Sequence, residues 1–208
     1  MIALARRHWW LVLLWIAGVA SVARLTAFMI DPARTAGSIV PDDDFYSHHN
    51  CATAYVRAGE LAQARVANLY LEQHYWGSRP DDPRASIGPF AVDLYEYPPP
   101  FLLPVRAALA VTRDFMTLRV AWFVVELALL LYAGYRLAHW IGGRSGRRIV
   151  ALAPALIASA PALATLQLGN FQLAAYSLSI LAMVAFADRR DALGGALLAF
   201  AKIGRAHV

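Results

Sequence analysis

The sequence predicts an all-α, polytopic membrane protein, and three observations support this prediction. Hydrophobic residues make up 59% of the 208 residues, and the mean hydropathy is +0.46, well above that of a soluble domain. Several apolar runs approach the roughly 20 residues that a transmembrane helix needs. Arginines gather at the ends of these runs, which is where membrane orientation requires them.

The charge pattern also argues against a nucleic-acid partner. The net charge is +5, but the basic residues follow the apolar runs instead of forming a separate patch, so membrane lipids are the expected surroundings. The single cysteine, Cys51, excludes an intrachain disulfide. No small-residue cleavage site clearly follows the first apolar run, so we expect that run to remain as a span. The bias toward Ala, Arg, Gly and Pro is typical of a GC-rich bacterial gene.

We predict spans at five apolar segments, the last of them incomplete: residues 9–30, 118–141, 149–165, 173–187 and 192–202. Arg6 and Arg7 place the N-terminus in the cytoplasm, because cytoplasmic connectors are rich in basic residues. The basic connectors after residues 141 and 187 are then also cytoplasmic. The same parity leaves residues 31–117 as a long external loop.

Two helical pieces are predicted inside this external loop. Residues 45–73 carry apolar side chains at helical intervals, and we expect Gly59 to break them into two parts that lie on the membrane surface. Residues 100–111 follow a proline run and are too short to span, so an interfacial or re-entrant helix is expected.

The last six residues, 203–208, read like the translation of a sequencing adapter and end an apolar run partway. We expect them to be an artefact. Residues 1–202 would then be a single transmembrane domain fragment from the N-terminal part of a longer protein. We expect such a fragment to be inactive alone.

Three carboxylates, Asp42, Asp43 and Asp44, stand between the first span and the loop helix. An acid before a helix is a good N-cap, which explains one of the three. A carboxylate at the outer face could instead act as a general base toward an acceptor hydroxyl. From the residues alone, capping or surface charge is the favoured interpretation.

His48 and His49 follow directly. Adjacent helical residues point about 100° apart, so the two imidazoles do not chelate one metal ion from one face. Asp44 and His48 are four residues apart and can share a face. That pair could bind a metal or a phosphate, or simply form a hydrogen bond, and we expect no metal.

Two further features could be functional. Glu126 lies inside a predicted span, where an ionisable residue indicates either a function or a hydrogen bond between helices. Residues 167–172 form a polar outer turn that begins with Gln167 and includes Gly169-Asn170-Phe171-Gln172. Its amides could bind a sugar hydroxyl or a lipid phosphate, or merely cap the turn.

The order and spacing of these features over residues 9–202 resemble glycosyltransferase family 87, the polyprenol-phosphate-mannose-dependent mannosyltransferases of the C-type membrane fold. The resemblance rests on Asp44-Phe45, His48-His49, Gly59-Glu60, Tyr97-Pro98-Pro99, Gly169-Asn170-Phe171-Gln172 and Lys202. It differs in two places: the family tends to have an aromatic pair at His48-His49, and Gly-Gln-x-Asn at the polar turn.

The resemblance implies a truncated C-type fold with membrane-parallel helices in the first external loop. It implies an inverting hexosyltransferase that moves a sugar from a polyprenyl phosphate to a lipid or glycan acceptor of the cell envelope. The sugar that the family implies is mannose. Asp44 would be the catalytic base, with Asp43 as runner-up. No cofactor or metal is expected. The substrate-binding residues would be His48, His49, Tyr97, Asn170 and Gln172.

The implied location is the bacterial inner, or plasma, membrane, with the site facing the periplasm. Two other functions stay open on the sequence. A transporter or flippase for lipid-linked sugars would depend on Glu126 more than on Asp44. A non-catalytic membrane scaffold would tolerate replacement of all three Asp residues.

Overall fold

A computed structural model of the chain describes residues 9–77 and 84–203. The all-α membrane fold is confirmed, since helices dominate these residues and the strands among them form one short hairpin. Predictions about Arg6, Arg7 and residues 204–208 lie outside the described residues. The long helices are α2 (Trp9–Ile30), α6 (Phe115–Ile141), α7 (Gly143–Ile157), α8 (Ala160–Leu168), α9 (Gln172–Ala187) and α10 (Asp191–Ile203).

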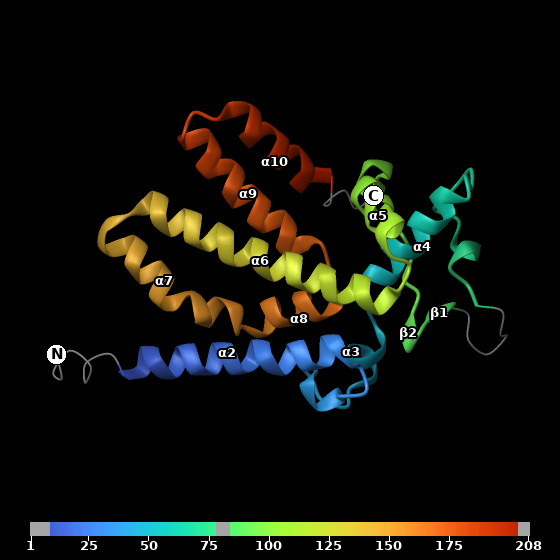
Figure 1. Cartoon of the computed structure of the whole chain (residues 1–208), viewed down its shortest axis with the longest axis horizontal. Helices are drawn as coiled ribbons and strands as arrows, with labels where there is room; N and C mark the ends of the chain where they lie inside the picture. The colour runs from blue at the N-terminus through green and yellow to red at the C-terminus, as the bar shows by residue number, and fades with distance from the viewer. Residues whose placement is uncertain (1–8, 78–83, 204–208) are drawn as a thin grey trace.

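The long helices form a bundle with the loop elements at one end of it (Figure 1). Helix α6 packs against α7 and α9, α2 packs against α7, and α9 packs against α10. The C-terminus of α2, the N-terminus of α6 and the turn between α8 and α9 meet at the end that carries the loop elements (Figure 1). Which side of the membrane this end faces stays a prediction.

Within the described residues, α2 and α6 are long and apolar enough to cross a membrane. Helices α7 and α8 bend by 62° where they meet, and together they would make a third span if the pair crosses as one. Prolines cause this break, because Pro154 lies inside α7 and Pro161 starts α8. Helices α9 and α10 are shorter, with 16 and 13 residues, so their spans remain predictions.

The loop helix differs from its prediction. It divides into α3 (Asp44–His48) and α4 (Ala52–Gln63), so the break falls at residues 49–51 and not at Gly59. Gly59 lies inside α4 against α5 (Leu102–Val111), where a Cβ atom would come within 2.6 Å of Leu109 Cδ1. The glycine therefore permits close helix packing and does not end the helix. Helix α4 ends early because Arg65 turns the chain with a φ of 59°.

The remaining loop elements are short. The 3-10 helix η3 (Pro99–Phe101) leads into α5, which packs on α4. The predicted helix at residues 100–111 therefore exists, while its place relative to the membrane remains a prediction. Strands β1 (Ser86–Ile87) and β2 (Phe90–Ala91) pair antiparallel.

A buried arginine joins the loop end to the bundle. The Arg119 guanidinium donates to the carbonyls of Phe28 and Met29, at 3.2 and 2.8 Å, in the last turn of α2. It lies between the rings of Phe28 and Phe90, at 4.8 and 4.5 Å from their centroids. The carbonyls at a helix C-terminus lack partners within the helix. Arg119 therefore fixes the end of α2, after which the chain continues into the loop that contains Asp42, Asp43 and Asp44.

Candidate functional site

The three neighbouring carboxylates have different environments. Asp42 adopts a φ of 58° and accepts a hydrogen bond from the Thr35 hydroxyl at 2.8 Å. Asp43 is the N-cap of α3 and accepts from the Tyr46 amide at 3.0 Å. Asp44 is the first residue of α3, and its side chain is 98% exposed. Capping and loop closure therefore account for Asp42 and Asp43 but not for Asp44.

Asp44 pairs with His48 one helical turn later. Asp44 Oδ1 lies 2.9 Å from His48 Nδ1, and the imidazole is 54% exposed. This is the i, i+4 contact that the spacing allows. An exposed carboxylate held by an imidazole can accept a proton from a hydroxyl group brought to it.

The side chain of Gln167, near the end of α8, hydrogen-bonds the loop residues on both sides of the three aspartates. Its amide nitrogen donates to Ser38 Oγ at 2.8 Å and to the Tyr46 carbonyl at 2.6 Å, and its Oε1 accepts from the Ile39 amide at 2.7 Å. The side chain is 1% exposed. Gln167 begins the polar outer turn predicted from the sequence, but no role was predicted for it.

The polar turn after α8 also packs against the loop. Gly169 adopts a φ of +65°, and a Cβ there would lie 3.2 Å from Asn50 Oδ1. The Asn50 amide donates to the Gln167 carbonyl at 3.0 Å, and the Cys51 amide donates to the Leu168 carbonyl at 2.7 Å. The turn is therefore part of the support for the segment that follows α3.

Asn170 and Gln172, both predicted to bind substrate, differ in exposure. Asn170 Oδ1 accepts from the Gln172 amide at 3.0 Å, which is the capping role that the sequence left open. Gln172 is exposed at the start of α9. Gln172 is therefore the more exposed residue of the two, since Asn170 is half-buried.

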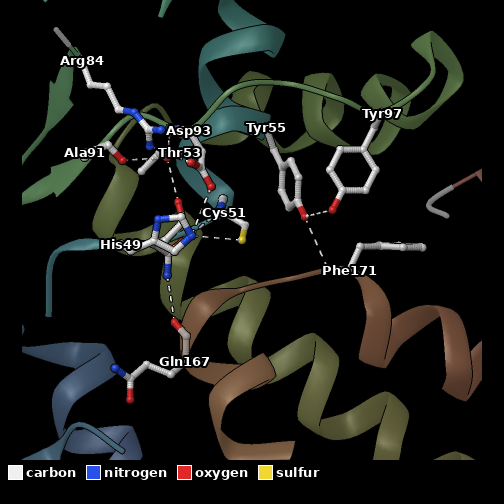
Figure 2. A network of polar contacts seen from close by, with 12 residues as sticks. His49, Cys51, Thr53, Tyr55, Arg84, Ala91, Asp93, Tyr97, Gln167 and Phe171 are labelled. Carbon is white, nitrogen blue, oxygen red and sulfur yellow. Dashed lines mark hydrogen bonds and ion pairs between the residues drawn. The ribbon is translucent and has the colours of Figure 1, made fainter. Parts of the chain in front are cut away.

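The His49 imidazole contacts the side chains of Asp93 and Cys51 (Figure 2). Its Nε2 lies 3.2 Å from Asp93 Oδ2 and 3.8 Å from Cys51 Sγ. Asp93 Oδ1 also pairs with Arg84 at 3.2 Å. Burial, and then the negative charge of Asp93, raise the pKa of the Cys51 thiol to about 12. Neither Cys51 nor Asp93 was selected from the sequence.

Tyr97 lies in a buried aromatic cluster with Tyr55, Phe101 and Phe171, and is 8% exposed. The Tyr55 hydroxyl donates to the Tyr97 hydroxyl at 3.0 Å and accepts from the Phe171 amide at 3.3 Å (Figure 2). Burial raises the pKa of Tyr97 to about 12. Tyr97 is therefore part of the core of the loop region.

Two cavities lie next to this region. An apolar cavity of about 260 Å³ lies between α4, α5, α6 and α9, and Tyr55, Trp122 and Phe171 line it. A second, more polar cavity of about 610 Å³ has three arginines and a tryptophan in its wall: Arg57, Arg84, Arg113 and Trp76. We did not single out these arginines from the sequence.

Comparison with known proteins identifies the family of this chain. The sequence profile described as glycosyltransferase family 87 matches residues 95–203, more than half of the chain. The chain belongs to glycosyltransferase family 87. The resemblance seen in the sequence is thereby confirmed, and this family 87 protein is a membrane glycosyltransferase that uses a sugar donor and an acceptor. No curated protein and no solved structure matches it.

The family match includes some of the predicted site residues. Tyr97, Asn170 and Gln172 lie within residues 95–203 of this glycosyltransferase. Asp44 and His48 lie before that range, so the roles predicted for them depend on their geometry.

Proposed function

We propose that this glycosyltransferase moves mannose from a polyprenyl phosphate to a hydroxyl of a lipid or glycan acceptor at the periplasmic face of the bacterial inner membrane. Asp44 is the general base in this proposal. The observation that supports it best is that Asp44 is exposed and paired with His48, while Asp42 and Asp43 already have structural hydrogen bonds.

The reaction is a single inverting displacement. Asp44 takes the proton of the acceptor hydroxyl as its oxygen forms a bond to the anomeric carbon of the sugar. The bond between that carbon and the phosphate oxygen breaks, and polyprenyl phosphate leaves with the electron pair. His48 holds the Asp44 carboxylate through the 2.9 Å contact. Gln172 is a candidate to hydrogen-bond the sugar, and Asn170 holds the turn on which Gln172 lies.

The apolar cavity supports a lipid-linked donor. Its walls come from α4 and α5 of the loop region and from α6 and α9 of the bundle. Apolar walls of this kind suit isoprene units, because burial of hydrocarbon surface contributes about 25 cal/mol per Å². The phosphate needs cations or amide donors nearby to stabilise the charge of the leaving group.

The test is the Asp44→Asn variant, assayed in membranes from cells that express the intact gene. Labelled mannose on polyprenyl phosphate is the donor, and transfer to the membrane fraction is measured. Removing a general base costs about 10²–10⁴-fold in rate, and we expect a loss in that range. The asparagine keeps the size and polarity of the side chain, so expression should be unchanged.

Asp43→Asn is the matched control. Asparagine caps a helix about as well as aspartate, so α3 should remain intact and transfer should stay close to that of the wild type. Transfer by Asp44→Asn at the wild-type rate would contradict the assignment of the base. A greater loss in Asp43→Asn than in Asp44→Asn would move the assignment to Asp43.

A further inference from the structure

We propose that His49, Cys51 and Asp93 form a binding site for a divalent metal ion of the zinc type. The site would join the segment between α3 and α4 to the strand β2 region, and so hold the helix that carries Asp44. This proposal does not rest on the proposed sugar transfer, because it concerns side chains that pair with one another and not with Asp44.

The distances between the three potential ligand atoms support this site. His49 Nε2 lies 3.2 Å from Asp93 Oδ2 and 3.8 Å from Cys51 Sγ, and all three atoms lie within 4.8 Å of one another. Zinc bonds of about 2.0–2.3 Å in a tetrahedron place neighbouring ligand atoms roughly 3.3–3.6 Å apart. A small adjustment of the Cys51 and Asp93 side chains would bring all three atoms to one ion.

The backbone holds the two segments of the site together. His49 forms an isolated parallel bridge with Ala91, which lies two residues before Asp93. The Thr53 hydroxyl donates to the Ala91 carbonyl at 3.2 Å and accepts from the Asp93 amide at 3.0 Å. The Phe45 ring stacks on the His49 imidazole with centroids 4.6 Å apart. Both segments are therefore fixed before a metal binds.

The chemistry of the ligand set selects the ion. A thiolate, an imidazole and a carboxylate are the zinc ligands that proteins use, and a set with only one carboxylate suits Mg²⁺ or Ca²⁺ poorly. A deprotonated Cys51 and the Asp93 carboxylate together balance the charge of a divalent cation. Arg84 pairs with Asp93 Oδ1 and leaves Oδ2 directed at His49, as an outer partner of a ligating carboxylate does.

Metal binding by Cys51 is coupled to loss of the thiol proton, because the thiolate is the ligand form of cysteine. A metal ion replaces that proton, which passes to solvent as the sulfur–metal bond forms. The three protein ligands leave one tetrahedral position for a further oxygen ligand.

The test uses Co²⁺ as a spectroscopic substitute for zinc in the purified, chelator-treated protein without a histidine tag. Cys51 is the only cysteine of the chain, so a sulfur-to-cobalt charge-transfer band in the near ultraviolet can come only from it. We expect the wild-type protein to develop this band at one equivalent of Co²⁺, and Zn²⁺ to abolish it by competition.

Matched variants identify the ligands. Cys51→Ser should abolish the charge-transfer band, and His49→Gln and Asp93→Asn should each weaken Co²⁺ binding by about tenfold or more. His48→Gln is the control, because His48 is adjacent in sequence but faces Asp44, and it should bind Co²⁺ like the wild type. If Cys51→Ser does not fold, the His49 and Asp93 variants still test the site.

Two results would overturn the proposal. One is a wild-type protein that develops no charge-transfer band, which would leave these residues as a hydrogen-bonded group. The other is equal loss of binding in His48→Gln and His49→Gln, which would indicate a different ligand set. Neither result bears on transfer by Asp44, which the Asp44→Asn assay measures separately.

Discussion

At the scale of single residues, the buried side chain of Gln167 stabilises the loop that contains the three aspartates. It makes three hydrogen bonds to the segment that flanks the aspartates, and it does so from a buried position. A buried polar group that loses its partner costs about 1–3 kcal/mol, so one substitution here leaves several groups unsatisfied.

We expect Gln167→Leu to lower the free energy of unfolding by about 2–4 kcal/mol, because the Ile39 amide and the Ser38 hydroxyl lose their partner. Thermal unfolding in detergent would measure the effect. Gln172→Leu provides the control, since Gln172 is exposed and should change stability by less than about 0.5 kcal/mol. Equal melting temperatures for the two variants would show that the Gln167 hydrogen bonds do not stabilise the fold.

Residue contacts within one helix turn could be predicted from the sequence, and the others could not. The i, i+4 spacing indicated the contact between Asp44 and His48, because helix geometry alone determines it. The contact of His49 with Asp93 depends on how strand β2 pairs with the chain beyond α3, which no local pattern encodes. Cys51 was considered only for disulfides, so its position beside His49 was missed.

At the scale of elements, the contact between α4 and α5 explains why α4 continues through Gly59. Gly59 was predicted to break the loop helix, since glycine has a poor helix propensity. The structure shows that close packing against Val105 and Leu109 outweighs that propensity. A glycine at a helix crossing and a glycine at a helix end look alike in a single sequence.

We therefore expect Gly59→Val to destabilise the protein by about 1–3 kcal/mol through overpacking against α5. Gly134→Val, in the middle of α6, is the matched control, because a Cβ there meets no atom within 4 Å in the described structure. Thermal unfolding would compare the two. A Gly59→Val protein as stable as Gly134→Val would mean that α4 and α5 can separate without cost.

At the scale of the whole molecule, composition and the placement of arginines predicted the all-α membrane fold, because these signals extend over the whole chain. They did not predict where short helices end or how the loop folds back on the bundle. Helix α9, with 16 residues, illustrates this: its apolar pattern predicts a span, although its length is below that of α2 and α6. The side to which the loop end faces is still a prediction.

Cysteine labelling can test that orientation. In a Cys51→Ser background, Glu72→Cys places one thiol in the loop region, and Ser145→Cys places one in the first turn of α7; both positions are exposed. The arginines of α7 should hold its start in the cytoplasm, since basic connectors stay inside. A membrane-impermeant maleimide should therefore label Glu72→Cys in intact spheroplasts, and Ser145→Cys only after permeabilisation. The reverse pattern would place Asp44 in the cytoplasm and contradict a periplasmic site, whereas the expected pattern would place the base where an outer-leaflet donor can reach it.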